Sequence, residues 1–449
     1  MPRLHHRSIA LHAFPRKHGV RDRRSERYND RMSITPPARI NVDRITSDIV
    51  AINRFTETDP TQGYSRPTFS TPWADAREYV LREARNAGAE ARNDAAGNLH
   101  LRHRSLGWET PAWLSGSHID SVPTGGQYDG VMGIVAALEI LRARPDLPLE
   151  LVIFAEEEGT TFGLGLLGSR LWTGALPAVQ TEQLVNRHGQ TFAEAGNIYG
   201  VDPSALARRD TEAAGLERGR YRGMVEIHAE QGLSLWDSGV PVAAVDRING
   251  RRQFELTFTG QGNHAGSTGM TGRRDALAGA AEMVLAVERL GKDLARQREY
   301  SVATTGVLSV FPNAANVIPG TVAMSVEARA QDDAVLDDAE NGVRRDGAKI
   351  AEDRGLAVSV ERSEAVLPSP LDDSVAMALQ QASARDGEPI PIVPSGALHD
   401  AAIVAREIPT AMLFVASRDG ISHNPQEYSR HEDIARAAQI LADMIAEGR

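Results

Sequence analysis

The segment SHIDSVPTGGQYDGV, residues 117–131, connects an apolar stretch to a second one of different periodicity. Residues 110–116 before it predict a strand, and the residues after Gly130 carry Val, Ile and Leu at helical spacing. A glycine-rich connection between a strand and a helix is where α/β sheets commonly bind ligands. His118 and Asp129 lie in it, and both side-chain types bind zinc, cobalt or manganese. Such a pair also occurs as ordinary turn and cap residues, so a metal site needs support from elsewhere in the chain.

Length and composition narrow the class of protein. A chain of 449 residues is expected to form two domains. It has no run of eighteen apolar residues, which predicts no membrane span. The net charge of -11 argues against nucleic-acid binding. The chain has no cysteine, which fits a cytoplasmic protein and leaves only His, Asp and Glu as metal ligands.

Residues 1–40 are predicted to be a basic, disordered N-terminal extension. Residues 1–31 carry nine Lys and Arg against three acidic residues, and they have no apolar core typical of a secretion signal. They could be a transit-like segment, a disordered arm, or an extension upstream of a natural start at Met32.

The remaining chain predicts an α/β catalytic domain with a mixed central sheet and an inserted smaller domain. Residues 41–245 and 365–449 are expected to form the two parts of the catalytic domain, because strand and helix patterns alternate in both. Residues 246–364 have the order strand, helix, strand, strand, helix, strand. This order is typical of a ferredoxin-like βαββαβ unit.

Further ligand-type side chains follow predicted strands of the catalytic domain. With the first pair they are His118 and Asp129, Glu157 and Glu158, His228 and Glu230, His399 and Asp400, and His423. Two metal ions need about six to eight donors, one bridging carboxylate, and an acid or base nearby. This set of residues therefore predicts a dinuclear hydrolase.

Seven motifs, in order, carry a resemblance that covers about residues 41–440. They are GSHIDSVPTGGQYDGVMGIVAALE, FAEEEGTTF, EIHAEQG, GNHAGSTGM, NVIPG, SGALHDA and GISHNP. In these motifs the chain resembles the M20 metallopeptidase superfamily and its hydantoinase/carbamoylase group. That group contains N-carbamoyl-L-amino acid hydrolases, β-ureidopropionases and allantoate amidohydrolases.

The resemblance implies a role for each matched residue. One metal ion would be bound by His118, Asp129 and His228, and the other by Asp129, Glu158 and His423. Glu157 would be the general base, which takes a proton from water and delivers it to the leaving nitrogen. The ions would be Zn, Mn, Co or Ni, since nitrogen and oxygen ligands accept each of them.

The inserted domain would act as a lid and would form a homodimer through residues 246–364. The resemblance implies that His264, supplied by the partner subunit, stabilises the oxyanion. It also implies that Gln231, Asn316 and Arg329 bind substrate, with His399 as a candidate that orients a ligand or substrate. From the residues alone, Arg329 could instead form a surface ion pair with nearby acids such as Asp332.

The expected reaction is hydrolysis of the ureido C–N bond of an N-carbamoyl-L-amino acid. Allantoate is an alternative substrate, and an aminoacylase or dipeptidase activity or a non-catalytic binding protein are more distant alternatives. Three positions depart from the family pattern, at Glu327, Leu233 and Leu398, and the two leucines leave the identity of the substrate open. No GxxxxGK[ST] or GxSxG motif supports nucleotide binding or a serine hydrolase.

Overall fold

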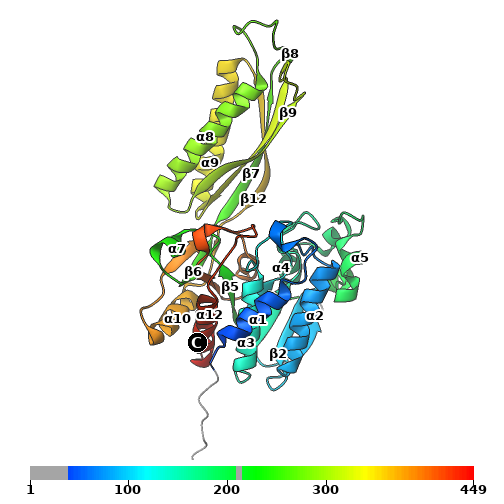
Figure 1. Cartoon of the computed structure of the whole chain (residues 1–449), viewed down its shortest axis with the longest axis vertical. Helices are drawn as coiled ribbons and strands as arrows, with labels where there is room; N and C mark the ends of the chain where they lie inside the picture. Colours follow the sequence, from blue (N-terminus) through cyan, green and yellow to red (C-terminus); the bar gives the residue numbers. More distant parts are fainter. Residues whose placement is uncertain (1–38, 209–214, 449) are drawn as a thin grey trace, which may run out of the picture. The chain divides into compact units, whose positions relative to one another are not determined.

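The computed structural model describes residues 39–208 and 215–448 (Figure 1). Most of the extension predicted for residues 1–40 therefore lies outside the described residues. Ile40 is described and packs against the hydrophobic core, so the predicted end of the extension was wrong at this residue. In the part of the chain that the structure describes, no helix is both long enough and apolar enough to span a bilayer.

The helices alternate with strands along most of the chain. The α-helices of the described residues are α1 (Val42–Ile52), α2 (Thr71–Asn86), α3 (Val131–Ala143), α4 (Leu167–Thr173), α5 (Phe192–Gly196), α6 (Pro203–Arg208), α7 (Ser234–Ser238), α8 (Ala276–Gln297), α9 (Asp333–Arg354), α10 (Asp373–Ser383), α11 (Asp400–Val404) and α12 (His431–Ala446). The strands are β1 (Ala89–Asn93), β2 (Leu99–His103), β3 (Ala112–His118), β4 (Leu149–Phe154), β5 (Tyr221–Ala229), β6 (Val242–Ile248), β7 (Gly250–Thr259), β8 (Asn263–His264), β9 (Val302–Phe311), β10 (Val317–Ile318), β11 (Thr321–Ala330), β12 (Ala357–Val366), β13 (Ser369–Pro370), β14 (Ile392–Ser395) and β15 (Thr410–Val415).

A large mixed sheet has the strand order β1-β2-β4-β3-β5-β15-β6-β13, and β14 also pairs with β6. The central strands β4, β3, β5 and β15 run parallel to one another. β1 and β2 pair antiparallel with their neighbours, and β6 pairs antiparallel with β15 and β13 but parallel with β14. The predicted α/β class with a mixed sheet is thereby confirmed. Because the central strands are parallel, their carboxyl ends meet at one edge of the sheet.

Helices cover both faces of this sheet, as the side chains of β4 show. Leu149, Leu151 and Ile153 pack into the core that contains α1, α3 and α12. Val152 and Phe154 point the other way, into the core that contains Trp172 of α4. Successive residues of a strand face opposite sides, so a strand that is buried along its whole length, as β4 is, indicates a sheet that is covered on both faces.

Two glycines let α3 begin directly beneath the connecting segment. Gly130 precedes the helix with φ of 65°, and a Cβ there would lie 2.5 Å from the His118 carbonyl oxygen. A Cβ at Gly133 would lie 2.4 Å from the carbonyl oxygen of Ile227 in β5. Glycine at both positions therefore allows the helix to pack closely against the strands that carry the two histidines.

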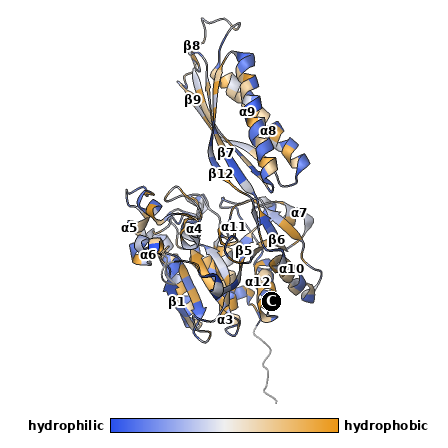
Figure 2. Ribbon diagram, turned by 180° about the vertical axis from the view of Figure 1, so that it is seen from behind, coloured by the Kyte–Doolittle hydropathy of each residue, from blue (hydrophilic) through white to orange (hydrophobic). Residues whose placement is uncertain are grey.

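A separate four-stranded antiparallel sheet has the order β12-β7-β11-β9. Along the chain these strands and α8 and α9 follow the predicted order, and Figure 1 shows the two helices side by side along one face of the sheet. Figure 2 shows hydrophilic and hydrophobic residues mixed along both helices. In α8 the buried residues Ala276, Ala280, Met283 and Val287 recur at helical spacing and face the sheet.

The predicted domain boundaries fall inside strands. The boundary at 245/246 cuts β6, which pairs with β15 over residues 242–245 and with β13 at 247–248. The boundary at 364/365 cuts β12 in the same way. The four-stranded sheet therefore begins at Gly250, and β6 belongs to the large sheet.

Candidate active site

Two of the predicted metal-binding histidines, His118 and His228, lie on neighbouring parallel strands. His118 is the last residue of β3, and His228 is the next-to-last residue of β5. Both imidazoles are buried, and their ring centroids are 5.9 Å apart. Parallel pairing therefore brings two residues that are 110 positions apart to one edge of the sheet.

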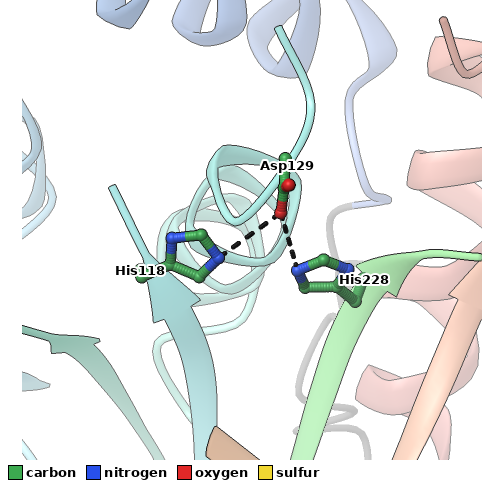
Figure 3. A group of neighbouring side chains, drawn as sticks. All are labelled: His118, Asp129 and His228. Carbon is green, nitrogen blue, oxygen red and sulfur yellow. Dashed lines mark ion pairs between the residues drawn. The ribbon is translucent and has the colours of Figure 1, made fainter. Parts of the chain in front are cut away.

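The Asp129 carboxylate lies between three histidines. Its Oδ1 is 3.4 Å from His118 Nε2 and 3.2 Å from His228 Nε2, as Figure 3 shows. Its Oδ2 is 3.1 Å from His423 Nε2. The two oxygens of one carboxylate thus face two different groups of ligand-type side chains.

Backbone hydrogen bonds orient both strand histidines. His118 Nδ1 donates to the Asp120 carbonyl oxygen at 2.9 Å, and His228 Nδ1 donates to the Ala229 carbonyl oxygen at 3.0 Å. In each neutral ring the proton is then on Nδ1, so the lone pair of Nε2 faces Asp129. A histidine that binds a metal ion is commonly held in this manner.

Burial and the surrounding charges act in opposite directions on the ionisable groups. Burial opposes ionisation of Asp129, but hydrogen bonds from His118, His228 and His423 hold the pKa of this carboxyl well below its usual range. Burial likewise opposes protonation of His118, yet the carboxylates of Glu157 and Asp129 raise the pKa of its imidazole well above the usual value. Without a bound cation, the histidines of the site therefore tend to be protonated.

Two consecutive glutamates after β4 complete the arrangement. Glu157 Oε2 is 3.7 Å from His118 Nε2, and Glu158 Oε2 is 3.7 Å from His423 Nε2. Burial and the neighbouring acids raise the pKa of Glu157 well above its usual range. Burial, followed by the charge of Asp129, raises the pKa of Glu158 to about 7. The neighbouring histidines act in the opposite direction on both carboxylates, but burial and the nearby acids outweigh them.

The donor atoms suit a divalent cation at two places. Ligand atoms of His118, Asp129 and His228 lie within 4.8 Å of one another, and so do those of Asp129, Glu158 and His423. His118 Nε2 and Glu158 Oε1 are buried and make no hydrogen bond of good geometry within the described residues. Buried polar atoms are normally satisfied, and a metal ion would satisfy these two.

Two acids that the sequence did not single out support the ligand residues. The Asp120 carboxylate accepts a hydrogen bond from the Glu158 amide at 3.1 Å, and burial raises its pKa. Glu427 accepts from the Tyr128 and Asp129 amides at 2.8 and 3.1 Å and from the Ser422 hydroxyl at 2.8 Å. Asp120 lies two residues after His118, and Glu427 lies four residues after His423, so proximity to the motif histidines was the available signal.

Three residues at the site have backbone conformations that side chains other than glycine seldom adopt. The φ angles are 57° at Glu156, 55° at Gln231 and 52° at His423. Such strain persists only where the surrounding structure imposes it, and it often marks a functional site.

A cavity of about 600 Å³ opens on these side chains. Gln231, Arg329 and His399 of the predicted substrate-binding residues line it. Gln231 Nε2 donates to Asp129 Oδ2 at 2.9 Å, and His399 Nε2 lies 3.1 Å from the Ser395 hydroxyl. Burial and the charge of His228 keep the pKa of His399 well below its usual range.

Arg329 forms an ion pair with a nearby acid, as the sequence-based alternative expected, but the acid is Glu327 and not Asp332. Arg329 Nε donates to Glu327 Oε1 at 2.7 Å, and its Nη1 donates to the Gly396 carbonyl oxygen at 3.2 Å. Asp332 instead pairs with Arg298 at 3.0 Å.

Four other candidates lie outside the cavity. His264 and Asn316 are exposed neighbours beside the short β8–β10 pairing, where the Ala265 amide donates to the Asn316 carbonyl oxygen. Glu230 accepts a hydrogen bond from the Leu235 amide, and Asp400 accepts one from the Ser169 hydroxyl at 2.5 Å. None of these four belongs to the two groups of ligand atoms around Asp129.

Comparisons with known proteins agree with the motifs. Residues 114–447 match the model of peptidase family M20/M25/M40. The chain is 34% identical over 388 residues to the N-carbamoyl-L-amino acid amidohydrolase of Geobacillus stearothermophilus, which covers 85% of this chain and 92% of that protein. It is 31% identical over 400 residues to the allantoate amidohydrolase of Escherichia coli strain K12, with 86% and 93% covered. An amidase of the hydantoinase/carbamoylase family from Burkholderia multivorans matches with a TM-score of 0.82 and 32% identity, over 92% of this chain and 98% of that one. The resemblance that the motifs indicated is confirmed.

Proposed function

We propose, from the premise that this chain belongs to peptidase family M20/M25/M40, that it hydrolyses the ureido C–N bond of N-carbamoyl-L-amino acids. The chain is an amidohydrolase of this family that acts on linear C–N bonds. The reaction consumes one water and releases the amino acid, ammonia and carbon dioxide. One observation supports it most: the two oxygens of Asp129 face separate sets of nitrogen and oxygen donors.

We propose two divalent ions per subunit. His118 and His228 would hold one with Asp129 Oδ1, and His423 and Glu158 would hold the other with Asp129 Oδ2. Zn, Mn, Co and Ni all suit these donors. Such ions, when bound, lower the pKa of water and polarise the ureido carbonyl group.

Glu157 is the proposed general base. Its side chain is largely buried, lies 3.7 Å from His118 Nε2 and lines the cavity together with Asp129. The Glu157 carboxylate would accept a proton from water and transfer it to the leaving nitrogen. Proton transfer of this kind is typically worth about 10²–10⁴ in rate.

Arg329 is the proposed partner of the substrate carboxylate. A guanidinium can bind a carboxylate with two parallel hydrogen bonds. Gln231 and His399 line the same cavity and are proposed to contact or orient the ureido group. Asn316 is the fourth proposed substrate ligand; because it is exposed and does not line the cavity of its own chain, we propose that it acts from a partner subunit.

A homodimer through the four-stranded sheet would bring His264 to the site. His264 is exposed and does not line the cavity of its own chain. On the edge strand β9, the exposed fraction is 57% for Val307 and 70% for Phe311. Edge strands seldom expose large apolar side chains without a partner to cover them. A second copy paired there would cover these side chains and supply an oxyanion donor in trans.

The test is ammonia release from metal-loaded protein. N-carbamoyl-L-amino acids are compared with allantoate, with ureidoglycolate and with N-acetyl amino acids. The proposal expects ammonia from the N-carbamoyl compounds at the highest kcat/KM. Preferred hydrolysis of allantoate would move the assignment to the second activity, which a similar protein from Escherichia coli carries by name. Cleavage of N-acetyl compounds without ammonia from any ureido compound would contradict the proposal.

A matched pair of variants tests the role of Glu157. Glu157→Gln should retain metal binding and lose about 10²–10⁴ in kcat. Glu230→Gln makes the same change outside the cavity and should remain active. Full activity in Glu157→Gln would remove Glu157 from the mechanism. The cytoplasmic location expected from the sequence remains a prediction, which cell fractionation would test.

A further inference from the structure

Three arginines line the cavity beside the candidate metal ligands. Arg251 of β7 and Arg329 of β11 are directly paired across the antiparallel strands. Arg170 of α4 lies on the wall formed by the large-sheet part of the chain. The proposed function uses one guanidinium, Arg329, for the substrate carboxylate and leaves the other two without a role.

The three guanidinium groups differ in their partners. Arg329 pairs with Glu327 at 2.7 Å, and Arg251 pairs with Glu364 at 2.5 Å. Within the described residues, the Arg170 side chain donates no hydrogen bond, and its buried Nε has no acceptor. A guanidinium has five N–H donors and remains charged at physiological pH, so this group can bind an anion.

The charges around Arg170 do not compensate it. Burial lowers its pKa, and the nearby cations Arg406 and Arg251 lower it further, whereas Glu364 and Asp400 raise it. Glu364 already pairs with Arg251, and Asp400 already accepts a hydrogen bond from Ser169. A desolvated charge without a partner is costly, so this wall of the cavity is suited to an incoming carboxylate.

We infer that Arg170 binds a second anionic group of the substrate, so that N-carbamoyl derivatives of acidic amino acids are preferred. The inference rests on the proposed function, in which Arg329 binds the α-carboxylate. Arg251 stands beside Arg329 across the strand pair and contributes positive charge on the same side. A cavity of about 600 Å³ accommodates a small dicarboxylate.

The decisive comparison uses N-carbamoyl-L-glutamate and N-carbamoyl-L-glutamine. These compounds have nearly the same shape and differ in the charge of the side-chain terminus. The wild-type protein should hydrolyse the glutamate derivative with a kcat/KM roughly ten- to a hundred-fold higher, as expected for a hydrogen bond between charged groups. Equal values, or a preference for the glutamine derivative, would overturn the inference.

Arg170→Gln should abolish this preference selectively. Its kcat/KM for the glutamate derivative should fall by roughly ten- to a hundred-fold, with less than about a threefold change for the glutamine derivative. Arg170→Lys keeps a positive charge and should retain part of the preference, which also covers the case in which the glutamine variant folds poorly. Arg406→Gln removes a charge from an exposed position outside the cavity and is the matched control.

The alternative is that Arg170 only attracts Glu364 and helps to hold the two sheets together. In that case Arg170→Gln and Glu364→Gln would each slow both substrates equally, and the inference would be wrong. The inference expects Glu364→Gln to keep or increase the preference, since it removes a competing carboxylate. Ammonia from neutral N-carbamoyl amino acids without a preference for acidic ones overturns the inference alone. Absence of ammonia from every ureido compound overturns the proposed function as well.

Discussion

His100 is a buried, positively charged side chain, and its contribution to the free energy of unfolding can be measured from how that free energy changes with pH. Its Nδ1 lies 2.8 Å from Glu150 Oε1, and its Nε2 lies 3.1 Å from Asp94 Oδ2. All three side chains are buried, His100 and Glu150 lie on the paired strands β2 and β4, and none of the three belongs to the groups of candidate metal ligands. Burial lowers the pKa of His100, but hydrogen bonds to Asp94 and Glu150 outweigh this and raise it to about 9.

The sign of the effect follows from the direction of the pKa change. A pKa raised from 6.5 to about 9 stabilises the fold fully below pH 6.5, and the stabilisation is lost as the pH rises through about 9. The size is about 3 kcal/mol, since each tenfold change in proton affinity is worth about 1.4 kcal/mol. The stability that Glu150 contributes depends on pH in the opposite direction. The pKa of Glu150 is lowered from 4.5 to about 2, so it stabilises the fold fully above pH 4.5, and this stabilisation is lost as the pH falls through about 2.

The assay compares wild-type protein with His100→Gln by chemical denaturation at pH 6.5 and pH 9.5. The difference in unfolding free energy between the two proteins should shrink by about 3 kcal/mol from the lower to the higher pH. His103→Gln, at the end of the same strand, is the control and should show no such change. A difference between wild type and His100→Gln that stays constant across this pH range would refute the reasoning.

Three further predictions concern the metal ions, the dimer and the packing of α3. Removal of the metal ions by a chelator should abolish activity and lower the temperature of the unfolding midpoint. The free energy of unfolding should fall by about 2.7 kcal/mol if the ion had been present at a hundred times its Kd. Added Zn, Mn or Co should restore both activity and stability. Mixing inactive Glu157→Gln and inactive His264→Ala subunits should restore about one quarter of wild-type activity. Half of the dimers that form at random contain one subunit of each kind, and one of the two sites in such a dimer is complete. If no activity returns, His264 does not act from the partner subunit. Gly133→Ala should lose about 1–3 kcal/mol of stability in denaturation experiments, because its Cβ would meet the Ile227 carbonyl oxygen at 2.4 Å, whereas Gly269→Ala has open space and should not.

The sequence predicted local elements well and long-range pairing poorly. The strand predicted over residues 110–116 overlaps β3, and the helix predicted after Gly130 is α3, which begins at Val131. In contrast, β6 was not predicted and was cut by a domain boundary. Its pairing partners β13, β14 and β15 lie more than 100 residues away, and no local pattern reports such pairing.

The candidate site divides in a similar way. The motifs located His118, Asp129 and the other ligand-type residues, because their residue types and positions after strands carry the chemistry. The motifs did not indicate Arg170, since a lone arginine on a short helix usually faces solvent. For Arg329 the alternative of an ion pair with nearby acids named Asp332 as an example, and the acid that pairs with it is Glu327, which the alternation of side chains along a strand places on the same face.

The two places where the chain crosses between the sheets are adjacent. Ile248 of β6 pairs with Ser369 of β13, so the outgoing and returning backbones are about 5 Å apart at this point. A gene that replaces residues 249–368 with a short turn would leave the strand order of the large sheet intact. The part of the chain that forms the four-stranded sheet is therefore expected to be exchangeable as one unit. The corresponding part of a relative with a different substrate range would be joined at the same two positions.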